Sequence, residues 1–245
     1  TIRTVKEAPI VTTQNPVTAA PTMATSAFSQ VEVSTLLPHN ASHMARSLSV
    51  PAYHGYIYLG GTHQIFAVSK QQGTAKALAG VAGTAGGVDG PATSATFHFI
   101  SGLVAKVHPE TVRIYTTSVV QHTVRLYDVY SAMVTTLAGA AGSVGSTDGG
   151  SVARFSGPSQ LDVREGALQT DLWVPDMQNH KIRHVVRDAN GGVTTSLLAG
   201  TGIMGTTDGA AVSATFINPW TCTFDSNDPN GGQWLYITGQ MTRIR

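Results

Sequence analysis

The chain has a single cysteine, few charged residues and no long apolar run. One cysteine cannot form an intramolecular disulfide, and Cys222 lies in an apolar, alternating stretch where a thiol usually acts as a small core side chain. No run of about 18 apolar residues occurs, so we expect no membrane-spanning helix within these residues.

The low charge also limits the class of protein. Charged residues make up 12% of the 245 residues, whereas glycine occurs 26 times, which excludes the composition of long helical arrays and favours a β-rich chain. A formal net charge of +1 gives no general attraction to phosphate polymers, so no nucleic-acid partner is expected. Thr, Ser, Gln and Asn take the place of Lys and Glu, a pattern that favours an extracellular or cell-surface location.

Residues 1–30 differ from the rest of the chain. They include an uncharged stretch rich in Thr, Ala and Pro, with Pro16 and Pro21, which predicts an extended arm laid over a surface. The tripeptide Asn40-Ala41-Ser42 follows, and it makes Asn40 a glycosylation candidate if the protein enters the secretory pathway.

The chain repeats one motif three times, over residues 78–97, 137–155 and 198–216. Each copy reads Leu-Ala-Gly, a glycine-rich run, Asp-Gly and then Ala-x-Phe. The aspartates, Asp89, Asp148 and Asp208, are 59 and 60 residues apart. A period this regular predicts stacked or radially arranged structural units.

Between Asp-Gly pairs the sequence predicts four short strands. In the clearest repeat they cover residues 159–163, 172–175, 182–186 and 193–198. The preceding repeat matches at 102–107, 112–116, 124–129 and 134–137, and the first at 56–59, 65–69 and 75–78. Four-stranded sheets packed face to face around an axis bury both faces, so we predict an all-β fold, a β-propeller of antiparallel blades.

The repeated motif then connects the outermost strand of one blade to the innermost strand of the next. We expect its Asp to accept backbone N–H bonds in its own turn, and its Phe to anchor between blades. The predicted structural residues are Asp89, Asp148, Asp208, Phe97, Phe155 and Phe216.

The repeat resembles the NHL repeat. Residues 158–200 contain Leu172-Trp173-Val174-Pro175-Asp176, Asn179-His180-Lys181-Ile182-Arg183 and Val-Thr-Thr-Ser-Leu-Leu-Ala-Gly, similar to the family's Leu-Tyr-Val-Ala-Asp, Asn-His-x-Ile-Arg and Val-Thr-Thr-Leu-Ala-Gly. The resemblance covers residues 56–245, although the second repeat has Gln121-His122-Thr123 in place of Asn-His-x. It implies a β-propeller, commonly of six blades.

About four blades are visible, over residues 46–80, 98–139, 156–200 and 217–245, and the last lacks an outer strand. Residues 31–37 read Val-Glu-Val-Ser-Thr-Leu-Leu, close to the outer strand before Gly200. We hypothesise that they supply a closing outer strand, to the last blade or to a neighbouring chain. The alternative is that the chain forms part of a larger ring.

No motif for chemistry accompanies the repeat. The nine histidines form no short metal motif, and there is no nucleophile elbow or phosphate loop, so no catalytic, cofactor-binding or metal-binding residue and no cofactor is predicted. His180 is expected to brace a turn. The densest basic cluster, Lys181, Arg183, His184 and Arg187, has no interleaved aromatic residues on which bases could stack.

These observations predict a non-enzymatic module for protein–protein interaction or adhesion, whose loops bind a protein partner or a larger assembly. The motif is similar to that of secreted or surface members of the NHL family, including flagellum-adhesion glycoproteins. Two alternatives stay open: a propeller lyase or hydrolase with an axial metal site, and a structural subunit of a large assembly.

Overall fold

The computed structural model describes residues 3–7, 31–35, 47–49, 51, 55–225 and 233–240. The chain divides into two compact units, Thr1–Ser42 and His43–Arg245. Apart from one short 3-10 helix, η1 (Met177–Asn179), every described element is a β-strand. The prediction of an all-β chain is therefore confirmed.

The first unit contains one antiparallel strand pair. Strand β1 (Arg3–Glu7) pairs with β2 (Val31–Thr35), with Val5 opposite Val33. Thr and Val on both strands favour this conformation. The sequence predicted an extended arm over residues 1–30 without a strand pair; β1 lies at its start, and the arm itself stays a prediction. Residues 8–30, 36–37 and Asn40 lie outside the described residues, and the role of residues 31–37 as a closing strand stays a prediction.

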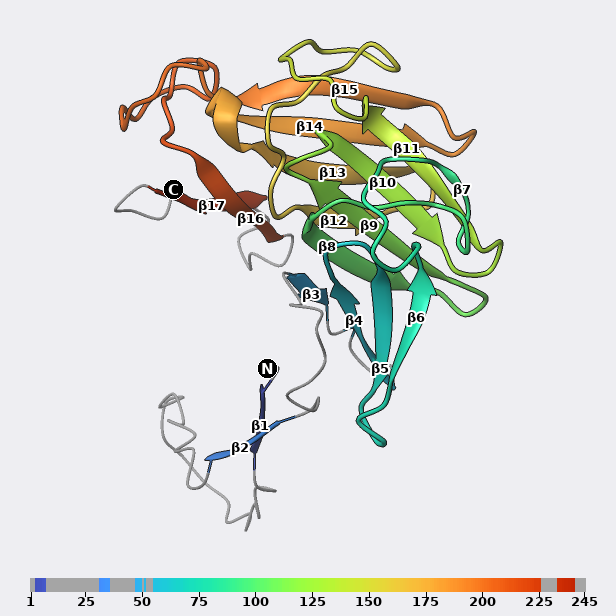
Figure 1. Ribbon diagram of the computed structural model, residues 1–245. Helices are drawn as coiled ribbons and strands as arrows, with labels where there is room; N and C mark the ends of the chain where they lie inside the picture. The colour runs from blue at the N-terminus through green and yellow to red at the C-terminus, as the bar shows by residue number, and fades with distance from the viewer. Residues whose placement is uncertain are drawn as a thin grey trace. The chain divides into compact units, whose positions relative to one another are not determined.

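The second unit contains four antiparallel sheets in chain order (Figure 1). The first sheet is β3 (Ser47–Ser49), β4 (Tyr56–Gly60), β5 (Ile65–Ser69) and β6 (Ala75–Ala79). The second is β8 (Ile100–Val107), β9 (Val112–Ser118), β10 (Thr123–Asp128) and β11 (Met133–Gly139), with the two-residue β7 (Gly90–Pro91) on its outer edge. The third is β12 (Asp162–Glu165), β13 (Gln169–Asp176), β14 (Lys181–Asp188) and β15 (Val193–Ala199). The fourth is β16 (Pro219–Asp225) and β17 (Trp234–Gly239).

The start of the third sheet differs from the prediction. Strand β12 begins at Asp162, whereas the sequence predicted a strand from Ser159. Gln160 instead forms a parallel bridge with Thr221 of β16, and its N–H donates to the Trp220 carbonyl at 3.0 Å. Pro158 and Ser159 already pair with the end of β13, so the chain contacts its own sheet, bridges to the neighbouring sheet at Gln160 and then continues as β12. The short β3, Ser-Leu-Ser, was not predicted.

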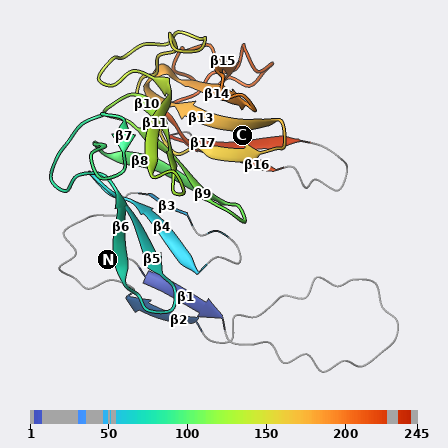
Figure 2. The ribbon, with the colours of Figure 1, turned by 90° about the vertical axis from the view of Figure 1, so that its right-hand side faces the viewer.

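Each pair of consecutive sheets encloses a hydrophobic core. The core between the first and second sheets includes Ile65, Phe97 and Ile114. The core between the second and third sheets includes Leu126, Phe155 and Leu172. Trp173, Phe216 and Ile237 belong to the third core. Figure 2 shows β16 and β17 beside β13, the strand that supplies Trp173. Both faces of the second and third sheets are thus buried by their neighbours.

Candidate functional site

The three repeated segments link consecutive sheets, and we call residues 78–97, 137–155 and 198–216 the first, second and third links. The first link pairs with the outer edge of the second sheet, where Gly90 of β7 lies opposite Val134 of β11. In the second link Gly149 pairs with Thr195 of β15. These two links therefore cover the exposed edge of the sheet that follows them.

The link aspartates bind strands of the following sheet. Asp89 accepts hydrogen bonds from Arg125 Nη2 at 2.7 Å and from the Thr136 backbone N–H at 2.8 Å. Asp148 accepts from Arg183 Nη2 at 2.5 Å and from the Leu197 N–H at 3.2 Å. The prediction that these carboxylates accept N–H groups of their own turns was wrong, because the third and fourth strands of the next sheet supply the donors.

The same two arginines stack on the link phenylalanines. Arg125 Cζ lies 4.6 Å from the Phe97 ring centroid, and Arg183 Cζ lies 5.0 Å from that of Phe155. Stacking of guanidinium on an aromatic face is favourable, the more so where water is excluded. We call Asp89–Arg125–Phe97 and Asp148–Arg183–Phe155 the two clamps, since each fixes a link to the sheet that follows it in the chain.

Sequence reasoning missed the arginine of each clamp. Arg125 follows Asp89 by 36 residues and Arg183 follows Asp148 by 35, a nearly equal spacing that could have identified it. The residue 35 positions after Asp208 is Arg243, which lies outside the described residues. Phe216 is buried in the third core, as Phe97 and Phe155 are in the first and second.

Two histidines fix the start of the next inner strand. His122 and His180 both have left-handed backbone, with φ of 57° and 54°. His122 Nδ1 accepts the Gly157 N–H at 3.1 Å, and His180 Nδ1 accepts the Asn218 N–H at 3.2 Å. Burial lowers the pKa of His122, which keeps its ring neutral and able to accept this bond.

The basic cluster seen in the sequence does not form one surface. The Arg183 side chain is fully buried, and it also bonds the buried Asp176, with Nη1 3.0 Å from Oδ2. Burial raises the pKa of the Asp176 carboxyl, while hydrogen bonds from Asn179, Ser156 and Arg183 oppose that shift. Lys181 points elsewhere, toward Ser146 of the second link at 2.8 Å.

The links carry exposed apolar side chains. Six of these side chains have between 61 and 70% of their surface accessible to solvent: Val88, Val144, Val152, Ile203, Met204 and Val212. Consecutive links also contact the same residues: Asn179 Nδ2 donates to Gly145 of the second link, and the Lys181 side chain lies between Ser146 and Gly202 of the third. We call the exposed faces of these links the link surface.

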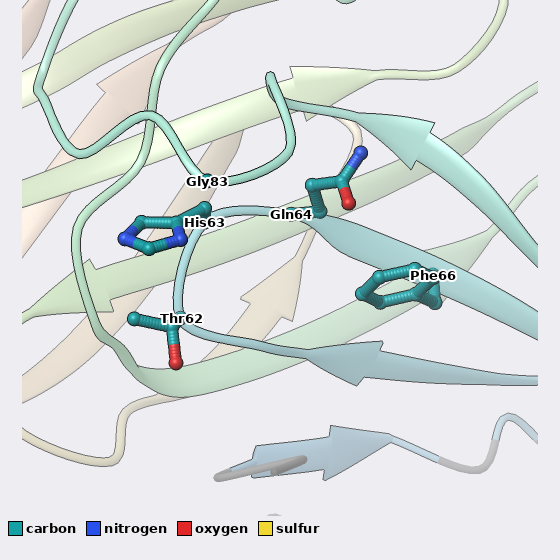
Figure 3. A pocket seen from close by; sticks show the side chains of 5 residues that line it. All are labelled: Thr62, His63, Gln64, Phe66 and Gly83. Carbon is teal, nitrogen blue, oxygen red and sulfur yellow. The ribbon is translucent and has the colours of Figure 1, made fainter. Parts of the chain in front are cut away.

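A small cavity lies under the first link. It encloses about 20 Å³ and is lined by Thr62, His63, Gln64, Phe66 and Gly83 (Figure 3). Phe66 holds the register position that Arg125 and Arg183 occupy in the next two sheets. The cavity is the size of one water molecule and is too small for a larger ligand.

Cys222 is buried and donates a hydrogen bond from Sγ to the Trp173 carbonyl at 3.2 Å. Burial raises the pKa of this thiol, so it stays protonated. Within the described ranges no group of three or more His, Cys, Asp or Glu side chains is placed to hold a metal ion. The same part of the chain contains no helix long and apolar enough to cross a membrane.

Solved structures share this fold. An auxiliary nutrient binding protein from Bacteroides thetaiotaomicron VPI-5482 superposes with a TM-score of 0.60 and 19% identity, over 84% of this chain and 47% of that one. A protein of unknown function from the same organism gives 0.55 and 16%, over 77% and 43%. The chain thus spans less than half the length of either protein. No family model matches the sequence, and a search of curated proteins finds no match.

Proposed function

We propose that the chain is a non-enzymatic binding module on a β-propeller of the NHL type, and that its link surface binds a protein partner. The proposed location is extracellular or at the cell surface, in agreement with the low charge of the chain. Four consecutive antiparallel sheets with buried shared faces support the propeller. The similar nutrient binding protein supports a binding role.

The exposed apolar side chains of the links carry the proposal. Val144 and Met204 hold equivalent positions, since each forms a parallel bridge with its link phenylalanine, Phe155 or Phe216. Both are more than 60% exposed, and the second clamp and the Gly149–Thr195 pairing hold the backbone around Val144 in place. Apolar residues grouped on a fixed surface are typical of a protein interface.

The test uses the purified chain as bait in its native extract, with cross-linking and identification of captured proteins by mass spectrometry. The dissociation constant for each purified partner is then measured by biolayer interferometry. We expect Val144→Ser combined with Met204→Ser to raise it about tenfold or more, because apolar contacts at the centre of an interface contribute most of the affinity.

Leu168→Ser is the matched control, since Leu168 is also strongly exposed but lies in the β12–β13 hairpin. It should leave the affinity unchanged. A bait that captures no specific protein, or a partner that binds the double variant as tightly as the wild type, would contradict the proposal.

A further inference from the structure

A second concave region lies where three inner strands end. It encloses about 380 Å³, and its lining comes from β8, β12 and β16 and the residues after β8. The lining residues are Lys106, Val107, His108, Asp162, Val163, Arg164, Glu165 and Phe224. We call this region the recess. Because the links precede the inner strands, the recess lies at the other end of these strands from the link surface.

Two cations hold the same position in neighbouring inner strands. Lys106 of β8 lies opposite Arg113 of β9, and Arg164 of β12 lies opposite Asp171 of β13, at equivalent points of the two sheets. A cation thus recurs in these inner strands. The recurrence lies at their ends.

The acidic groups of the recess are already bound by protein donors. Glu165 accepts a hydrogen bond from the Tyr115 hydroxyl at 2.5 Å and pairs with His108, and only 8% of its side chain is exposed. Asp162 accepts the N–H groups of Val163 and Phe224, at 2.7 and 2.8 Å. Both carboxylates therefore have donors of the protein itself, and none of their hydrogen bonds among the described residues involves Lys106 or Arg164.

The cations retain donors for a ligand. Within the described part of the chain, the Lys106 ammonium makes no hydrogen bond or ion pair, and Arg164 donates one side-chain bond, from Nη2 to Asp171 at 3.0 Å. The Arg164 guanidinium also lies over the Phe224 ring, 5.0 Å from its centroid, which fixes its plane. A fixed, planar guanidinium beside an ammonium matches the geometry and charge of a carboxylate.

The lining of the recess is mostly polar, and Phe224, Val107 and Val163 form its apolar part. Phe224 stacks on Trp173 with ring centroids 4.0 Å apart and an interplanar angle of 7°, so the two rings form a rigid platform. Val107 and Val163 extend the apolar lining. A volume of this size is within the range of small-molecule sites.

We infer that the recess binds a small organic carboxylate with an apolar face, held by Lys106 and Arg164 and packed against Phe224. The inference does not depend on the link surface, and either proposal can fail without the other. A planar guanidinium beside a single ammonium matches a carboxylate, whereas phosphate groups typically bind at clustered backbone N–H donors.

The test measures binding of four probes to the purified chain by isothermal titration calorimetry: phenylacetate, galacturonate and their neutral counterparts phenylacetamide and galactose. At least one acid should bind about tenfold more tightly than its neutral counterpart, and Lys106→Gln should weaken that acid about tenfold. Arg164→Lys, which keeps the charge but loses the planar fork, should also weaken it.

Lys76→Gln is the control, because Lys76 is an exposed lysine of β6 far from the recess in sequence. It should bind the acid as the wild type does. The inference is overturned if no acid binds up to about 10 mM, if each acid binds no better than its neutral counterpart, or if Lys106→Gln is without effect. Tighter binding of phenyl phosphate than of phenylacetate would also overturn it.

Discussion

At the residue scale, each clamp arginine is a buried charge held by several hydrogen bonds. Arg183 is fully buried, yet it bonds Asp148, Asp176 and the carbonyls of Thr147 and Arg154. A buried charge is tolerated only where partners replace its water, and here four acceptors do so. Removing the guanidinium would leave the fully buried Asp176 without its cation.

We therefore expect Arg183→Met to lower the free energy of unfolding by about 3 kcal/mol or more, the usual cost of breaking a buried ion pair on one side. Urea unfolding followed by tryptophan fluorescence measures this. Arg187→Met is the matched control on the same strand, because Arg187 is partly exposed and makes no ion pair with a described residue. A loss of similar size in both variants would contradict the role of the clamp.

At the element scale, the turns before β10 and β14 and the ends of β11 and β15 fit closely together. Gly139 has φ of 90°, and a Cβ built on it would lie 2.3 Å from the His122 carbonyl oxygen. Gly200 has φ of 98°, and a Cβ built on it would lie 2.6 Å from the His180 carbonyl oxygen. The glycine of Leu-Ala-Gly thus allows the link to leave the outermost strand directly over the neighbouring turn.

Three alanine substitutions separate the causes of this requirement. Gly139→Ala should cost about 3 kcal/mol, because left-handed backbone and a steric clash both oppose it. Gly142→Ala, with φ of 72° and open space around it, should cost only about 1 kcal/mol.

Gly55→Ala should leave the stability unchanged or slightly raised, since that position has neither a clash nor positive φ. Thermal unfolding of the three variants gives the ranking. Equal losses for Gly139→Ala and Gly142→Ala would show that the close approach to His122 does not matter.

At the scale of the whole molecule, the sheets are coupled in series by contacts that recur from one pair to the next. The His122 ring in the second sheet binds the Gly157 N–H before the third, and His180 in the third binds Asn218 before the fourth. Ser101 and Ser159 donate hydroxyl bonds to the carbonyls of Pro158 and Trp220, again one sheet further on. The unfolding of this unit should therefore respond to protonation of a coupling histidine.

The pKa of His122 is lowered by burial, so the folded state favours the neutral ring and the unfolded chain binds the proton more readily. As pH falls from about 7.5 to 5.5, through the usual histidine pKa, the free energy of unfolding should decrease. His122→Asn should make this decrease smaller, because asparagine tolerates left-handed backbone and does not titrate. Urea unfolding at several pH values measures both slopes, and parallel slopes would rule out a contribution from His122.

The sequence predicted the strands of the repeat because alternation and turn residues are local signals. Ile65–Ser69 and Val193–Ala199 are examples, and the burial of Phe97, Phe155 and Phe216 followed from the repeat itself. The clamp partners were not predicted, because Arg125 and Thr136 lie 36 and 47 residues from Asp89. The recess was missed for a similar reason, because it joins the ends of strands from three repeats that are far apart in the sequence.

The clamps also bear on the order in which the chain acquires its structure during synthesis. Asp89 is held by Thr136, and Asp148 by Leu197, 47 and 49 residues downstream. When the first link leaves the ribosome, its anchoring strands have not yet been translated, and the link stays unfixed until the second sheet is complete. Each new sheet thus secures the connection made before it, so a ribosome stalled within a sheet leaves the preceding link accessible to proteases and chaperones.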